Sequence, residues 1–168
     1  MILPYFQNCF LLILPILLWN AIFFKLLPPP FKKETFWHNI PSYIRIPENI
    51  LRIVVVLCPL LMKFSVAEPY QKLGLILYIF GVCLYFWSWI MHIYFPQSAW
   101  SKSIFGFAAP AYTTIIWFVG IGLAGSSLFI KIPYHYSIYL VISALFVIFH
   151  TSHAYIVYSR SKDFSQPI

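Results

Sequence analysis

Charged residues are scarce in this chain, and acidic ones are the scarcest of all. Only 9% of its 168 residues are charged, with four Asp and Glu against eleven Lys and Arg. Soluble domains carry about 25% charged residues, so this composition cannot cover a water-facing surface. The hydrophobic content of 61% and the mean hydropathy of +0.82 indicate a protein whose solvent is lipid.

Cysteine is also rare, which argues against two kinds of site. Cys9, Cys58 and Cys83 each lie within an apolar run and lack the paired local spacing of a disulfide framework or a structural metal site. We therefore expect them to be small core residues. The sequence predicts no metal site and leaves the cofactor unknown.

The basic excess does not indicate a nucleic-acid partner. The net charge is +7, but the Lys and Arg residues stand at the ends of apolar runs, as in the flanks of transmembrane helices. The stretch from Gly120 to Gly125 matches the dinucleotide fingerprint G-x-G-x-x-G by its letters. It lies inside a charge-free run, and no carboxylate follows until Asp163. We interpret these glycines as small residues that let two membrane helices approach closely.

The run from Leu73 to Phe95 is free of charged residues and long enough to cross a bilayer. At about 1.5 Å per helical residue it matches a hydrocarbon core of about 30 Å. Its small and polar residues recur at spacings of three and four, so they share one helical face, which should turn away from lipid toward other helices. This face consists of Gly74, Tyr78, Gly81, Tyr85, Ser88 and His92.

The chain reads as one membrane domain, an all-α, compact bundle of five transmembrane helices with helix 73–95 at its centre. The apolar runs are separated by proline-containing or charged connections, which are too short to fold as soluble domains. The predicted helices are 3–27, 48–66, 73–95, 111–130 and 137–158, with an interfacial segment at 31–46 and a short tail at 159–168.

Helix 48–66 is the least regular of the five. Only ten uncharged residues separate Arg52 from Lys63, fewer than the roughly 18 that a span needs. The segment is either re-entrant, or it spans with both basic side chains reaching outward to the interface. We favour a span that is kinked at Pro59. Arg52 then lies about one turn inside the membrane, either as an interfacial anchor or as a cation facing a pocket.

Counting Lys and Arg predicts the orientation. With five spans, an N-terminus outside and a C-terminus in the cytoplasm place eight basic residues on the cytoplasmic side and three outside. We therefore expect a multi-pass protein of the cell membrane in this orientation.

Polar residues from several helices then fall at similar depths in the cytoplasmic half. Ionisable residues inside a membrane are costly and indicate functional sites. The candidate catalytic residues are His92, His150 and His153, and the candidate ligand-binding residues are Asn20, Glu48, Arg52, Tyr85 and Ser88.

Three interpretations of these residues compete. The histidines either only join helices through hydrogen bonds, or belong to a polar pocket open to the cytoplasm, or bind a metal or haem. In the pocket, Arg52 holds an anionic head group or carboxylate, a histidine moves protons, and Glu48 orients the arginine.

The function favoured by the sequence is a binding protein or enzyme for a lipid, quinone or isoprenoid-like molecule. The main alternative is a non-catalytic structural or assembly subunit, and a haem- or metal-binding protein is less favoured. The expected partners are the lipid bilayer, such a ligand, and a second copy or a partner subunit.

Overall fold

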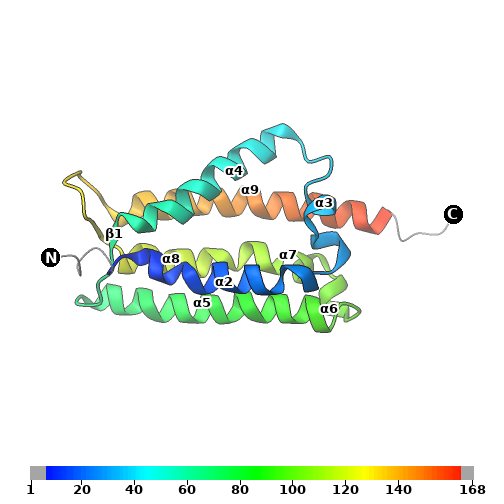
Figure 1. The fold of residues 1–168 in the computed structure, drawn as a ribbon, viewed down its shortest axis with the longest axis horizontal. Helices are drawn as coiled ribbons and strands as arrows, with labels where there is room; N and C mark the ends of the chain where they lie inside the picture. The colour runs from blue at the N-terminus through cyan, green and yellow to red at the C-terminus, as the bar shows by residue number, and fades with distance from the viewer. Residues whose placement is uncertain (1–6, 164–168) are drawn as a thin grey trace.

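The computed structural model describes residues 7–163, with the side chains of the last helix described up to residue 161. Its helices lie side by side along one long axis (Figure 1). Within the described residues, four helical stretches are long and apolar enough to cross a membrane: Cys9–Leu26, Pro69–Tyr94, Ile104–Ala124 and Tyr136–Ser161. The all-helical fold with several candidate membrane spans is confirmed, whereas the count of five transmembrane helices is not.

The first span is a helix of mixed type. The 3-10 turn η1 (Cys9–Leu12) leads into α2 (Leu14–Phe23), and the 3-10 turn η2 (Phe24–Leu26) ends the stretch. The predicted start of this helix, at residue 3, lies outside the described residues.

The connection that follows is only partly the interfacial segment predicted at 31–46. It holds the short elements η3 (Pro29–Phe31) and α3 (Lys33–Phe36), but the next long helix, α4 (Ser42–Leu57), already begins inside the predicted range. Pro41 precedes this helix, and Pro47 lies within it. The expected start at residue 48 is therefore wrong. A proline near the beginning of a helix removes only one backbone hydrogen bond, so the helix can include it.

Helix α4 also ends earlier than residue 66. It passes into the 3-10 turn η4 (Cys58–Leu60), whose second residue is Pro59. The α-helix ends just before this proline instead of continuing through it with a kink; the proline has no N–H to donate, and its ring crowds the carbonyl four residues earlier.

Helix α5 (Pro69–Tyr94) agrees closely with the predicted run 73–95. Its start is fixed by a capping box, in which the Gln71 side chain accepts a hydrogen bond from the Glu68 backbone N–H at 3.1 Å. The shared small and polar face is confirmed, since all six of its residues are buried.

The predicted helix 111–130 is shifted in the structure. Ser103 caps α7 (Ile104–Tyr112) by accepting a hydrogen bond from the Gly106 N–H at 3.0 Å, so the helix begins earlier. Helix α8 (Thr114–Ala124) continues it and ends at Gly125. The short α6 (Ala99–Lys102) precedes them.

This α7–α8 stretch, rather than α5, is the centre of the bundle. In the most apolar 18-residue segment of Ile104–Ala124, 67% of the residues are buried, against 33% in that of Pro69–Tyr94. A Cβ atom at Gly120 would lie 2.5 Å from the backbone N of Tyr78 and 2.6 Å from the carbonyl O of Gly74. The glycines therefore let α5 and α8 meet backbone to backbone, and the fingerprint-like letters lie within a helix.

Helix α9 (Tyr136–Asp163) begins one residue before the predicted helix 137–158 and continues into the predicted tail. Residues 164–168 lie outside the described residues. A small antiparallel ribbon, β1 (Met62–Lys63) paired with β2 (Ser127–Leu128), joins two connections, and Asn8 bridges to Lys63. Two-residue strands are too short to leave a pattern in a sequence, so the ribbon was not predicted.

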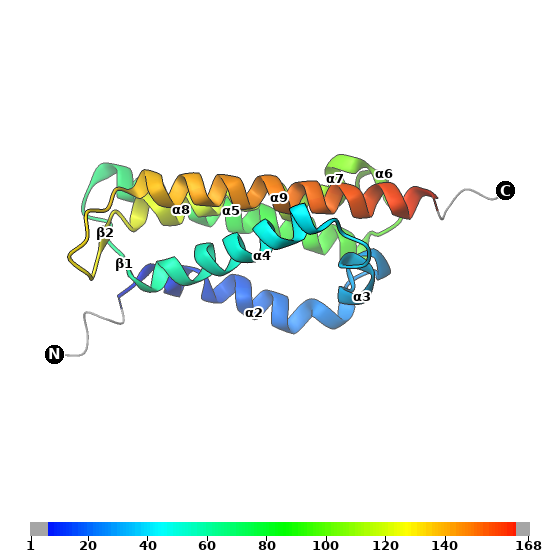
Figure 2. The same cartoon turned by 90° about the horizontal axis from the view of Figure 1, so that it is seen from above.

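The helices alternate in direction along the axis (Figures 1 and 2). Helices α2, α5 and α9 run from the β1–β2 ribbon toward α3, and α4 and the α7–α8 stretch run back. We call these two ends of the bundle the ribbon end and the α3 end. At the ribbon end the Tyr70 and Tyr136 rings stack at 6.1 Å, and at the α3 end the Tyr158 hydroxyl donates to the Lys102 carbonyl at 3.1 Å.

Candidate functional site: a buried carboxylate beside an apolar cavity

Glu48 on α4 is fully buried and faces α9. Its Oε1 accepts hydrogen bonds from the Arg52 guanidinium and from His150 Nδ1, the latter at 2.9 Å. Its Oε2 lies 2.6 Å from His153 Nδ1. Glu48 and Arg52 are four residues apart, and the histidines three apart, so each pair lies on one helical face. The spacing of each pair along its helix thus brings four predicted site residues together. We call Glu48, Arg52, His150 and His153 the Glu48 cluster.

The hydrogen bonds of His153 determine how many protons the cluster holds. Its Nε2 lies 2.8 Å from the Phe36 carbonyl oxygen, which can only accept, so Nε2 carries a hydrogen. Its Nδ1 faces the Glu48 carboxyl oxygen, and two lone pairs would repel at that distance. One proton must therefore lie between Nδ1 and Oε2, which makes the Glu48–His153 pair neutral as a whole.

Aromatic rings surround the cluster. The Arg52 guanidinium lies 5.0 Å from the centroid of the Trp37 ring and 5.9 Å from that of Phe146, distances typical of cation–π contacts. The His150 ring stacks on Phe146 with centroids 5.3 Å apart. Arg52 and His150 therefore both pack against the Phe146 ring.

A cavity of about 360 Å³ lies beside the cluster. Four of the predicted site residues line it: Asn20, Arg52, Tyr85 and His150. The Tyr85 hydroxyl donates to Asn20 Oδ1 at 2.8 Å, which ties α5 to α2. The rest of the wall is largely aliphatic and aromatic, and it includes four of the six tryptophans: Trp19, Trp37, Trp89 and Trp117.

Ser88 and His92 do not line this cavity. The Ser88 hydroxyl donates to the Tyr85 backbone carbonyl at 2.7 Å and is buried. His92 is also buried, and its Nε2 donates to the Gly106 carbonyl at 2.9 Å, which joins α5 to α7. Both residues make local packing contacts, although the depth argument had grouped them with the others.

Reasoning from sequence missed the aromatic residues of the connection before α4. The Phe36 carbonyl accepts from His153, and the Trp37 ring covers Arg52. The signal was present, since residues 31–46 are too apolar for a free linker. It was interpreted as contact with the membrane surface instead of contact with the site.

No group of three or more His, Cys, Asp or Glu side chains in the described part of the chain is arranged to hold a metal ion. Comparison with known proteins gives no family model, curated protein or solved structure that matches this chain. The functional argument therefore depends on the geometry of the Glu48 cluster and its cavity.

Proposed function

We propose that this protein binds an amphipathic molecule of the bilayer, of the lipid, quinone or isoprenoid-like kind, in the cavity beside the Glu48 cluster. One observation carries the proposal: a largely apolar, aromatic cavity is bordered by a few polar side chains. Binding sites for small molecules have this character, with apolar walls for affinity and a few polar groups for orientation.

The size of the cavity agrees with a ligand of one chain. Its volume of about 360 Å³ is near the lower end of the roughly 300–1,000 Å³ typical of ligand sites. A single apolar chain with a compact head group suits this volume better than a complete two-chain phospholipid.

Access from the bilayer is supported by the position of α2. Only 17% of the first span is buried, so most of this helix faces outward. Leu17 and Phe24 line the cavity and are 40% and 57% exposed, so the same side chains border the inside and the outside. A membrane-dissolved ligand would therefore enter past α2 without passing through water.

We also propose that α4 is a fifth crossing. Helices α2 and α5 both run from the ribbon end to the α3 end, so the chain between them has to return over the same length (Figure 2). The outer face of α4 is apolar and exposed, as expected for contact with lipid: Tyr43, Ile46, Ile50, Ile53 and Leu57.

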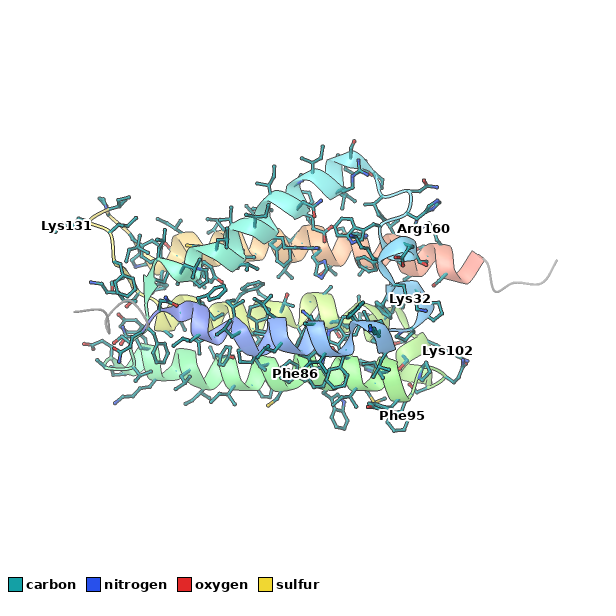
Figure 3. All side chains as sticks on the ribbon, in the orientation of Figure 1. Lys32, Phe86, Phe95, Lys102, Lys131 and Arg160 are labelled. Atoms are coloured by element: carbon teal, nitrogen blue, oxygen red, sulfur yellow. The ribbon has the colours of Figure 1, made fainter. Side chains whose placement is uncertain are left out.

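The α3 end would face the cytoplasm of the cell membrane. Figure 3 places Lys32, Lys102 and Arg160 at this end and Lys131 at the opposite one. This distribution supports the orientation expected from the positive-inside rule, with the N-terminus outside.

The roles within the site follow from the remaining hydrogen-bonding capacity. Arg52 and His150 border the cavity and would meet the head group, whereas Glu48 and His153 hold them in position. Of the three histidines proposed as catalytic, only His150 lines the cavity. Its Nδ1 bonds Glu48, and its Nε2 has no hydrogen-bond partner in the described structure. Proton transfer to or from a ligand would use this atom.

The test is to identify what co-purifies with the protein. The full chain is isolated in mild detergent, and its bound molecules are extracted for mass spectrometry, with a visible spectrum recorded to detect haem. Ala111→Leu adds three carbons to the cavity wall, and Ala99→Leu makes the same change at an exposed position of α6. We expect wild type and Ala99→Leu to co-purify with one enriched molecule that has a single apolar chain. The amount of this molecule bound per protein should fall at least severalfold in Ala111→Leu.

Bulk lipid in equal amounts from all three proteins would contradict the proposal. It would favour the alternative, a structural or assembly subunit, which is supported by the internal hydrogen bonding of Glu48, His92 and Asn20. A haem spectrum would instead assign the histidines as ligands.

A further inference from the structure

We infer that the head group of the ligand carries a net negative charge, so that the site selects an apolar chain ending in a carboxylate or a phosphate. This inference rests on the proposed function and narrows it, because it disfavours neutral head groups such as quinones.

The first step is the charge of the Glu48 cluster. The Glu48–His153 pair shares one proton and is neutral as a whole, since both ring nitrogens of His153 face oxygen atoms that accept. His150 donates through Nδ1 to Glu48 and needs no second proton. Arg52 is always protonated. The cluster therefore carries a net charge of about +1, although it contains a carboxylate.

The second step is the absence of another anion. Glu34 and Glu68 are the other acidic residues in 7–161, the range over which side chains are described, and both are exposed. Glu48 is the acidic partner in every ion pair among the described residues. The charge of Arg52 thus has no second carboxylate to neutralise it.

The third step is the position of this charge. Arg52 lines the cavity, and its side chain is 37% exposed. The rings of Trp37 and Phe146 beside it stabilise a cation only in part. A net positive charge on the cluster next to apolar walls is unfavourable, and its attraction to an anion is stronger beside such walls than in bulk water. An anionic head group is the partner that neutralises the site.

The geometry of the guanidinium agrees with this ligand. Arginine presents several N–H groups in one plane, which match the oxygen atoms of a carboxylate or a phosphate. Glu48 accepts from one guanidinium nitrogen of Arg52, Nη2, so the other N–H donors remain for a ligand. His150 also lines the cavity, and its Nε2 can accept a hydrogen bond from the P–OH group of a singly charged phosphate.

The experiment uses the four cavity tryptophans as reporters. Purified full-length protein in a neutral detergent is titrated with a fatty acid brominated in mid-chain, with its methyl ester, and with an alkyl phosphate brominated in the same way. Bromine quenches nearby tryptophan fluorescence, and specific quenching must saturate and be reversed by the unbrominated molecule. The acid and the ester differ in charge but share the chain.

We expect the acid, the phosphate or both to bind wild type about tenfold more tightly than the ester, or better. This ratio corresponds to one charge-assisted hydrogen bond, at about 1.4 kcal/mol per factor of ten. Arg52→Gln should abolish the preference and leave ester binding in place, Arg52→Lys should retain part of it, and Lys131→Gln at the ribbon end should not change it. The relative affinity of acid and phosphate identifies which head group the site takes.

Equal affinities of wild type for the acid, the phosphate and the ester would overturn the anion inference and leave the proposed cavity function standing. No saturable quenching by any of the three would overturn both. A preference for the anions that persists in Arg52→Gln would also refute the inference, because it assigns the charge to Arg52.

Discussion

The proton shared by Glu48 and His153 predicts an unusual result for the substitution Glu48→Gln. Removing the charge of a buried ion-pair partner ordinarily leaves an uncompensated charge and costs about 3–5 kcal/mol. Here the substitution replaces a neutral pair by another neutral pair. His153 would keep its hydrogen on Nε2 for the Phe36 carbonyl, and its free Nδ1 would accept from the new amide. The amide oxygen would still accept from Arg52 and His150.

The magnitude follows from the bonds that change. Glu48→Gln retains every hydrogen bond and loses only charge assistance, so we expect a decrease of about 1–2 kcal/mol in the free energy of unfolding. Glu48→Ala removes all three acceptor contacts, takes the carboxylate partner from the half-buried Arg52 and from the fully buried His153, and should cost about 3–5 kcal/mol. Glu34→Gln, on the exposed surface of α3, is the matched control and should change stability by less than about 0.5 kcal/mol.

The assay is unfolding of the detergent-solubilised protein, followed by tryptophan fluorescence during titration with a denaturing detergent. Selective labelling of histidine with nitrogen-15 adds a direct readout, since NMR distinguishes protonated from unprotonated ring nitrogens. In wild type both nitrogens of the His153 ring should carry or share a proton, and in Glu48→Gln only its Nε2 should carry one. If Glu48→Gln destabilises the protein as much as Glu48→Ala, the proton count is wrong, and the charge inferred for the site is wrong with it.

Three further substitutions test the packing that supports the site. Gly120→Ala should destabilise the protein by about 1–3 kcal/mol in the same unfolding assay. The added Cβ would lie 2.5 Å from the Tyr78 backbone nitrogen, and a backbone atom cannot move aside as a side chain can. Tyr85→Phe should cost about 1 kcal/mol and leave the Asn20 amide oxygen without its donor, so stability equal to wild type would show that this bond contributes nothing. His92→Phe should lower stability by about 1 kcal/mol and leave ligand quenching unchanged, because His92 does not line the cavity; weaker quenching would place it in the site.

Much of the fold could be predicted because membrane helices leave strong signals. Absence of charge identified the runs, and the spacing of small and polar residues identified the buried face of α5 correctly. The errors concern helix ends and the identity of the central helix. They arose where a capping serine, Ser103, or a tolerated proline, Pro47, outweighed the apolar pattern. The burial of α7–α8 depends on neighbouring helices that pack against several of its sides. The residues of one segment do not indicate how many helices will surround it.

The candidate site was predictable in its residue types and only partly in its membership. The four-residue spacing of Glu48 and Arg52 and the three-residue spacing of the α9 histidines were visible in the sequence, and these four residues do meet. Depth in the membrane cannot tell which way a side chain points around its helix, and His92 points to the Gly106 carbonyl instead of the cavity. The proton count needed the Phe36 carbonyl, a backbone group that sequence patterns do not indicate.

The large separation along the chain between Glu48 and its histidines has a consequence for biosynthesis. The two partners follow it by 102 and 105 residues. At a translation rate of about 5–20 residues per second, α9 emerges roughly 5–20 seconds after α4. During that interval the carboxylate and arginine of α4 have only each other, in a helix of marginal hydrophobicity. Nascent α4 would therefore wait near the membrane surface or beside the insertion machinery, and its final position would be set only when the last helix arrives.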